Sequence, residues 1–297
     1  MPPKPLRELM TISAATIPVI DSLHPVGCNY AAWLVDIWGV MHNGLRAFPS
    51  AVETTRRFRE QGGIVVLLSN SPRPSPPLQH QLKSLGVVDQ SYDATISSGD
   101  LTRHELAKHA GARVFHLGPE RDLPIFAGID VARVDAKEAE LIVCTGLFDD
   151  ETETPEHYER ILKEFAGRKL TMLCANPDHL VERGHRLVYC AGALALLYEE
   201  DGGEVIYAGK PYRPIYELAE ETIAGLAGRK IARSEILAIG DGIRTDMQGA
   251  ADFGLDSVFV ASGLHVGPGG EGLDELHLAE LFDGRRPPRA AMPALAW

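Results

Sequence analysis

Residues Trp33-Leu34-Val35-Asp36-Ile37-Trp38-Gly39-Val40 decide the fold of this 297-residue chain. An apolar run ends here in an aspartate and then breaks into a glycine turn. Buried parallel strands read as continuous apolar runs, and ligands of open α/β sheets bind beyond the carboxyl ends of such strands. Asp36 is therefore predicted to lie at the ligand-binding edge of a parallel sheet.

The segments that follow repeat the same rhythm of strand, loop and helix. Ser50 and Glu53 have the spacing of a capping box, which predicts a helix through Glu60 that ends at Gly62-Gly63. Residues 63–70 form the next apolar run and end in Ser69-Asn70, and a helix is expected across 77–85. Two successive β-loop-α units predict the α/β class with a doubly wound, Rossmann-like parallel sheet.

Residues 104–182 carry strands of their own, expected at 113–117, 141–145 and 170–174. Thr154-Pro155 opens a helix between them, with proline at the first helical position. This segment is predicted to be an inserted domain, flanked by the two halves of a core at 1–103 and 183–283. The second half resumes the first pattern, with helices at 191–200, 213–226 and 246–253 and strands at 204–208, 235–240 and 257–261.

The two ends of the chain are less regular. Residues 1–28 are expected to form a lead-in, with one helix outside the core, and the tail 284–297 to be a linker whose end docks back. The net charge of −12 argues against nucleic-acid binding, and four scattered cysteines predict reduced, mostly buried thiols. Neither a signal peptide nor a membrane span is recognisable, so a soluble cytoplasmic protein is expected.

Polar side chains stand at the ends of four predicted strands. They are Asp36, Ser69 with Asn70, Lys210 in Gly209-Lys210-Pro211, and Asp241 with Asp246 in the run 240–246. Any one of them alone is more typical of a turn or a helix cap. All four in this order, each after an apolar strand, indicate one shared site.

This combination resembles the haloacid dehalogenase superfamily, specifically the class IIA phosphatases of NagD type, over about residues 30–265. Those proteins carry a large α/β cap between their second and third motifs, and Asn176-Pro177-Asp178 and Gly-Lys-Pro match further segments. The resemblance implies that residues 104–182 form the cap. It also implies that a small phosphorylated metabolite is the substrate and that caps pair in a homodimer.

The resemblance also assigns roles to the site residues. Asp36 would be the nucleophile, Ser69 would bind the phosphoryl group, and Lys210 would neutralise it and keep Asp36 ionised. Because a carboxylate repels a phosphate dianion, Mg²⁺ must bridge the two. Hard oxygen ligands suit Mg²⁺, and the implied set is Asp36, the backbone carbonyl of Trp38, and Asp241, with Asp246 supporting the metal directly or indirectly.

Position 38 departs from the family, whose active phosphatases usually have aspartate two residues after the nucleophile. That aspartate protonates the leaving group, which is worth about 10²–10⁴ in rate, whereas Trp38 cannot transfer a proton in this way. One interpretation is that Trp38 packs against Trp33; the other is that it forms a shelf for substrate or excludes water. His42, six residues past Asp36, is a candidate replacement proton donor.

Residues of the cap are expected to govern specificity. Asn70, Asn176 and Asp178 are candidate substrate-binding or domain-interface residues, although Asn-Pro-Asp is also a common turn. Four further groups could contact an anionic substrate, or could simply be solvated. They are Arg73, Arg183, His185 and the amides of Gly192-Ala193.

The predicted function is a Mg²⁺-dependent hydrolase that dephosphorylates a sugar phosphate, nucleotide or cofactor phosphate through an aspartyl-phosphate on Asp36. The alternatives are a pseudo-enzyme that binds metal and ligand without efficient hydrolysis, and a superfamily hydrolase that cleaves another bond, C–halogen or C–P.

Overall fold

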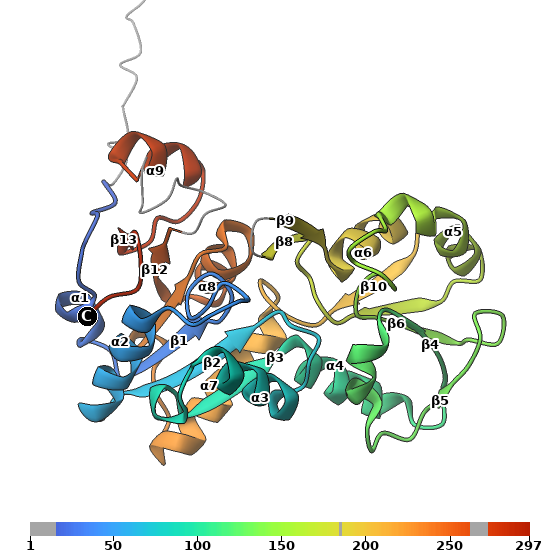
Figure 1. Cartoon of the computed structure of the whole chain (residues 1–297), viewed down its shortest axis with the longest axis horizontal. Helices are drawn as coiled ribbons and strands as arrows, with labels where there is room; N and C mark the ends of the chain where they lie inside the picture. Colours follow the sequence, from blue (N-terminus) through green and yellow to red (C-terminus); the bar gives the residue numbers. More distant parts are fainter. Residues whose placement is uncertain (1–15, 184–185, 262–272) are drawn as a thin grey trace, which may run out of the picture.

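The computed structural model describes residues 16–183, 186–261 and 273–297. It consists of two α/β units that lie side by side, each built on a parallel sheet (Figure 1). The α/β class and the parallel doubly wound core predicted from the sequence are confirmed. Within the described ranges, no helix combines the length and apolarity needed to cross a membrane.

The first sheet has six parallel strands with β1 near its centre, between β11 and β2. β1 alternates its side chains between two apolar layers, since Trp33 and Val35 face one and Ala32 and Leu34 the other. This two-sided burial explains its unbroken apolar run. In spatial order the strands are β13 (Ala290–Met292), β12 (Asp256–Val260), β11 (Ile236–Gly240), β1 (Ala32–Asp36), β2 (Ile64–Ser69) and β3 (Ala94–Ser97).

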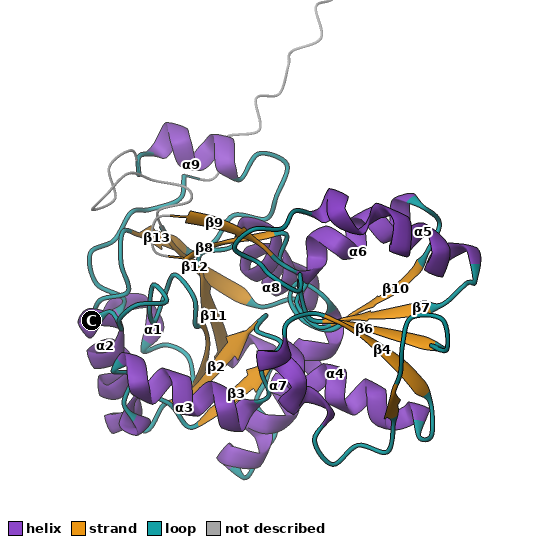
Figure 2. Cartoon of the chain, turned by 45° about the vertical axis from the view of Figure 1, so that its right-hand side comes forward, coloured by secondary structure: helices purple, strands orange, loops and turns teal. Residues whose placement is uncertain are grey.

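Helices cover both faces of this sheet (Figure 2). Side chains of α1 (His24–Gly27), α2 (Pro49–Glu60) and α3 (Ser75–Leu85) belong to or border the first layer. Those of α4 (Ser98–Leu106), α7 (Arg213–Ala227) and α8 (Gln248–Phe253) pack in the second layer. α9 (Glu275–Leu281) packs beside β12 in a smaller cluster.

The second sheet has five parallel strands, and this corrects the predicted domain boundary. The segment 183–208 was expected in the core, but β10 pairs with β7 of the second sheet and α6 packs on that sheet. The insertion therefore extends to Tyr207. Its elements are β4 (Arg113–Leu117), β5 (Ala132–Arg133), β6 (Leu141–Cys144), α5 (Glu159–Gly167), β7 (Thr171–Cys174), the hairpin β8 (Leu180–Arg183) and β9 (Arg186–Tyr189), α6 (Ala191–Glu200) and β10 (Glu204–Tyr207).

Three local expectations had different outcomes. The capping box at Ser50 is wrong, because α2 begins at Pro49 and Glu53 instead forms ion pairs with Arg56 and Arg57. The lead-in 1–28 falls partly outside the described residues; from Thr16 on, its one helix is the short α1. All four cysteines are free, three of them buried, as expected, and Cys28 is exposed.

The C-terminal tail does dock on the body, and it does so more extensively than expected. Residues 290–292 add β13 to the sheet edge, and the Leu23 amide donates to the Ala296 carbonyl. Trp297 then lies 6.4 Å from Trp33, measured between ring centroids. The tail thus closes one end of the core, beside α1 (Figure 1).

Trp33 organises that end of the core. Its ring is fully buried and stacks on Phe58 with centroids 3.8 Å apart, and its Nε1 donates to the Gly27 carbonyl at 3.1 Å.

Trp33→Ala should lower the free energy of unfolding by about 3–5 kcal/mol, measured by urea denaturation. Leu226→Ala, at a site 47% exposed on α7, is the control and should change stability by less than about 0.5 kcal/mol. Equal losses in the two variants would contradict this assignment.

Candidate active site

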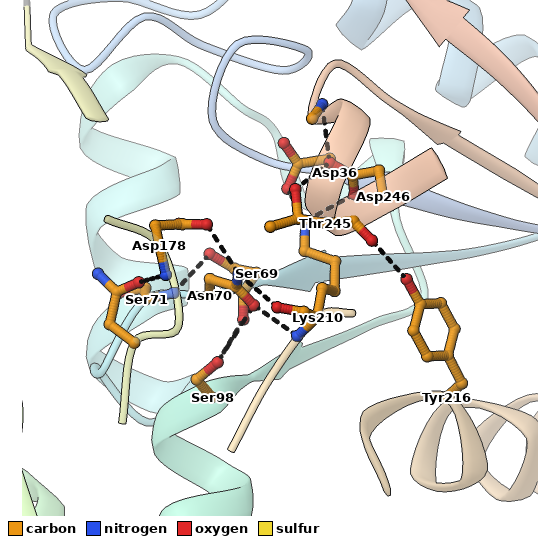
Figure 3. A network of polar contacts seen from close by, with 12 residues as sticks. Asp36, Ser69, Asn70, Ser71, Ser98, Asp178, Lys210, Tyr216, Thr245 and Asp246 are labelled. Carbon is orange, nitrogen blue, oxygen red and sulfur yellow. Dashed lines mark hydrogen bonds and ion pairs between the residues drawn. The ribbon is translucent and has the colours of Figure 1, made fainter. Parts of the chain in front are cut away.

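The carboxyl ends of the core strands face the second unit and carry the predicted polar residues (Figure 3). Asp36 ends β1, Ser69 ends β2, and Asp241 follows β11. Lys210 arrives differently from what was expected. It follows β10 of the second sheet, so the chain delivers this lysine as it crosses back into the core.

Lys210 lies between two carboxylates. Its Nζ donates to Asp36 Oδ1 at 2.5 Å and to Asp246 Oδ1 at 2.7 Å, and all three side chains are buried. The second oxygen of Asp246 accepts from the Gly242 amide at 3.1 Å and from Thr245 Oγ1 at 3.3 Å. Asp246 therefore anchors both the lysine and the turn after β11.

Charge is not balanced in this cluster. Burial raises the pKa of Asp36 well above its usual range, Asp246 adds to the effect, and Lys210 opposes it without cancelling it. Burial would lower the pKa of Lys210, but Asp246 and Asp36 together raise it well above the ordinary value. The two carboxylates thus favour the charged form of Lys210, and the Lys210 ammonium lowers the pKa of Asp36 against the effect of burial.

Asp241 completes a group of three carboxylates. Oxygen atoms of Asp36, Asp241 and Asp246 lie within 4.8 Å of one another. Three carboxylates around one ammonium make this cluster rich in negative charge, and the ligand atoms that they offer are all oxygens. A divalent hard cation fits both the charge and the donor set.

Gly39 makes room for this arrangement. A Cβ at position 39 would lie 2.1 Å from Asp241 Oδ2, and the residue has φ of +87°, a conformation that disfavours other residues. The glycine after Trp38 therefore lets the loop pass directly over the carboxylate.

Asn70 holds the backbone of Lys210. Its Oδ1 accepts from the Lys210 amide at 2.7 Å, and its Nδ2 donates to the Lys210 carbonyl at 3.1 Å and to Asp178 Oδ1 at 2.9 Å. Gly209 permits this approach, because a Cβ there would lie 2.6 Å from Asn70 Oδ1. These bonds favour a structural role for Asn70 over the predicted contact with substrate.

The Asn176-Pro177-Asp178 segment is both a turn and a domain contact. Asn176 Oδ1 accepts from the Asp178 amide at 3.1 Å, which closes the turn. The Asp178 carboxylate then reaches across to Asn70 of the core. Burial raises the pKa of Asp178, although Lys210 and the Asn70 hydrogen bond oppose this shift.

Trp38 does not pack against Trp33. Its ring meets His42 edge-on with centroids 5.2 Å apart, and a Cβ on Gly44 would lie 2.7 Å from the ring. His42 is buried, accepts from the Gly44 amide through Nδ1, and has its pKa lowered by burial to about 4. A neutral, buried imidazole is a poor proton donor, so the structure argues against His42 in that role.

Two of the remaining candidates bind other parts of the protein. Arg183 donates to both oxygens of Asp150, and the Gly192 amide donates to the Asp178 carbonyl. His185 lies outside the described residues. Arg73 lines a cleft between the two units, together with Arg121 of the second unit.

Sequence reasoning overlooked Ser98, which donates toward Asn70 Oδ1 at 3.4 Å. It lies at the start of α4, which was not anticipated, nor was β3 before it. The signal is present, since Ser97 and Asp100 form a capping box immediately after the short apolar run of β3.

Comparison with known proteins identifies the family. Residues 33–132 match a model of haloacid dehalogenase-like hydrolases, and 207–271 match a second, HAD-hydrolase-like model. A crystal structure of a hydrolase of the haloacid dehalogenase-like family from Brucella suis is 42% identical, with a TM-score of 0.84, and covers 93% of this chain and 100% of its own. The chain belongs to the haloacid dehalogenase-like hydrolases.

Two curated relatives are more distant. Human haloacid dehalogenase-like hydrolase domain-containing protein 2 is 28% identical over 239 residues, which is 78% of this chain and 84% of that protein. The acid sugar phosphatase of Staphylococcus saprophyticus is 23% identical over 241 residues, 80% of this chain and 88% of its own. Each match covers more than three quarters of this chain.

Removal of Asn70 tests the link between Lys210 and the second unit. Asn70→Ala leaves the Lys210 amide and the Asp178 carboxylate without this partner, so the free energy of unfolding should fall by about 2–4 kcal/mol. Hydrogen exchange should also quicken at the amides of Asn176, Asp178 and His179. The matched control is Ser84→Ala on the exposed side of α3. Unchanged exchange at 176–179 in a destabilised Asn70→Ala protein would show that Asn70 does not hold this turn.

Proposed function

We propose that this hydrolase is a Mg²⁺-dependent phosphatase of small phosphorylated metabolites, with Asp36 as its nucleophile. The observation that carries the proposal is the cluster of Asp36, Asp241 and Asp246 around the buried ammonium of Lys210. The name of the staphylococcal acid sugar phosphatase supports a phosphorylated small molecule as substrate.

Asp36 and Asp241, with the backbone carbonyl of Trp38, are the proposed ligands of Mg²⁺. Both oxygens of Asp246 already bind Lys210, Gly242 and Thr245, so we assign Asp246 an indirect, supporting role. The ion would supply the positive charge that lets a carboxylate approach a phosphate dianion.

Each protein group has a defined task in the proposed reaction. An Asp36 oxygen attacks phosphorus and the bond to the leaving oxygen breaks, which gives an aspartyl-phosphate that water then hydrolyses. Lys210 stabilises charge on the phosphoryl oxygens, while Ser69 Oγ and the amides near Ile37 and Asn70 donate to them. Ser69 Oγ accepts from the Ser71 amide at 3.1 Å, which fixes the position of this hydroxyl group.

Trp38 shapes the substrate range in this proposal. Without an acid at position 38, expulsion of an alkoxide is slow, whereas a phenolate, a carboxylate or a phosphate leaves unaided. The enzyme should therefore favour aryl, acyl or anhydride phosphates over simple alkyl esters. The indole packs over the loop at Gly44. In this proposal, a proton for the leaving group comes from bulk water or from the substrate itself.

The nucleophile is tested by Asp36→Asn. Turnover of p-nitrophenyl phosphate with Mg²⁺ should fall by at least about 10³-fold, and a chelator should abolish wild-type activity. Asp89→Asn, a change of an exposed carboxylate on the far side of α3, is the control and should retain activity. Full phosphate release by a folded Asp36→Asn protein would refute the assignment, and no turnover of any phosphate by the wild type would favour a pseudo-enzyme.

Trp38→Asp tests the missing acid. The variant should hydrolyse an alkyl phosphate such as glycerol 3-phosphate about tenfold faster or more, with a smaller gain for p-nitrophenyl phosphate, whose leaving group needs no proton. Trp38→Asn provides the matched loss of volume without an acid. If a folded Trp38→Asp protein gains nothing over Trp38→Asn, the missing proton donor does not limit turnover of alkyl phosphates, and this part of the proposal is wrong.

A further inference from the structure

A cleft of about 290 Å³ separates the core from the inserted unit on the α3 side. Pro74, Pro77 and Gln81 line it from the core, and residues of the 3₁₀ helix Glu120–Phe126 line it from the insertion. Since both units contribute walls, the cleft lies at the boundary between the core and the inserted unit, where a capped hydrolase can hold the part of a substrate that is not its phosphoryl group. This location rests on the proposed function.

Two arginines from different units face this cleft. Arg73 of the core donates through Nη1 to the neutral amide oxygen of Gln81. Within the described ranges, no carboxylate lies at ion-pair distance from the Arg73 guanidinium. Its positive charge is therefore held in place by a neutral partner and stays available to an anion.

Arg121 is also incompletely neutralised. It shares the carboxylate of Asp150 with Arg183, so one buried acid faces two guanidinium groups. Glu151 approaches Arg183 only to 4.0 Å and is mostly exposed. The residues that line the cleft thus include two arginines, Arg73 and Arg121, and one acid, Asp122.

Asp122 forms the floor between the two arginines. It is buried, and burial raises its pKa, while Arg121 and Arg73 oppose the rise and Thr145 donates a hydrogen bond. Arg121 and Arg73 are therefore both close enough to act on the same carboxyl group.

Arg73 is tied to the phosphoryl end of the site by a short chain of bonds. The Arg73 amide donates to Ser71 Oγ at 3.2 Å, and the Ser71 amide donates to Ser69 Oγ at 3.1 Å. Four residues span at most about 14 Å even when extended, and these two turns shorten the distance. The backbone therefore keeps Arg73 within about 14 Å of Ser69, along the side of the site that faces the cleft.

We propose that Arg73 and Arg121 form a subsite for a second anionic group of the phosphorylated substrate, a carboxylate or a second phosphate. Guanidinium groups match either anion through paired hydrogen bonds. Because the two arginines come from different units, such a substrate also holds the cap against the core while Asp36 reacts. Substrates with one phosphoryl group and no other charge lack this contact.

The experiment compares four probes with Mg²⁺: p-nitrophenyl phosphate, glucose 6-phosphate, 3-phosphoglycerate and fructose 1,6-bisphosphate. In the wild type, kcat/KM for at least one doubly anionic probe should exceed that for glucose 6-phosphate by about tenfold or more. Arg73→Gln and Arg121→Gln should bring this ratio close to one. Lys83→Gln removes a positive charge from the exposed side of α3, outside the cleft, and should keep the wild-type ratio.

The carboxylate and the bisphosphate arms distinguish the two anion types. If the wild type shows no preference for either, or if the arginine variants keep a preference, the subsite proposal is wrong, even when p-nitrophenyl phosphate is hydrolysed. If nothing is hydrolysed, the proposed function fails separately. Calorimetric binding of the same probes to Asp36→Asn, with and without Arg73→Gln, then decides the subsite, which requires weaker binding of doubly anionic probes on loss of the arginine.

Discussion

A buried ammonium group held between two carboxylates places the strictest demand on this structure. Removing either acid from Lys210 would leave a buried charge without its partner, which typically costs about 3–5 kcal/mol. The three groups come from separate parts of the chain: Asp36 from β1, Asp246 from the turn after β11, and Lys210 from the connection that leaves the second sheet. The cluster therefore forms only when both sheets are correctly paired. It also explains why Gly209 and Gly39 occupy positions where a side chain would collide with Asn70 or Asp241.

The same connection joins the two units functionally. Asn70 binds the Lys210 backbone on one side and Asp178 of the insertion on the other, so the position of the cap and that of the lysine are coupled through one amide group. We propose that Arg73 and Arg121 add a second link between the core and the cap when both bind the same anionic group of a substrate. In our proposal the cap contributes in two ways. Asp178 helps Asn70 to hold the backbone of Lys210, and Arg121 binds the second anionic group of the substrate.

The sequence was informative wherever an apolar run led directly into a polar residue. Asp36, Ser69 and Asp241 were placed correctly because the carboxyl ends of parallel strands meet at one edge. Lys210 was found for the wrong reason, since β10 has the same apolar pattern as a core strand and only its pairing with β7 reveals its sheet. The cap boundary failed for the same cause. The partners of Trp38 and Asp178 depend on loop paths and on contacts between units, which hydrophobic periodicity does not encode.

The absence of an acid at position 38 separates this protein from the usual phosphatase pattern, although Asp36, Lys210 and the acidic cluster are all present. The most direct test of the account is chemical trapping of the intermediate. The enzyme is quenched during turnover of p-nitrophenyl phosphate, reduced with borohydride and analysed by peptide mass spectrometry. The account predicts homoserine at position 36. Continued turnover with the modification at another residue, or at none, would contradict it.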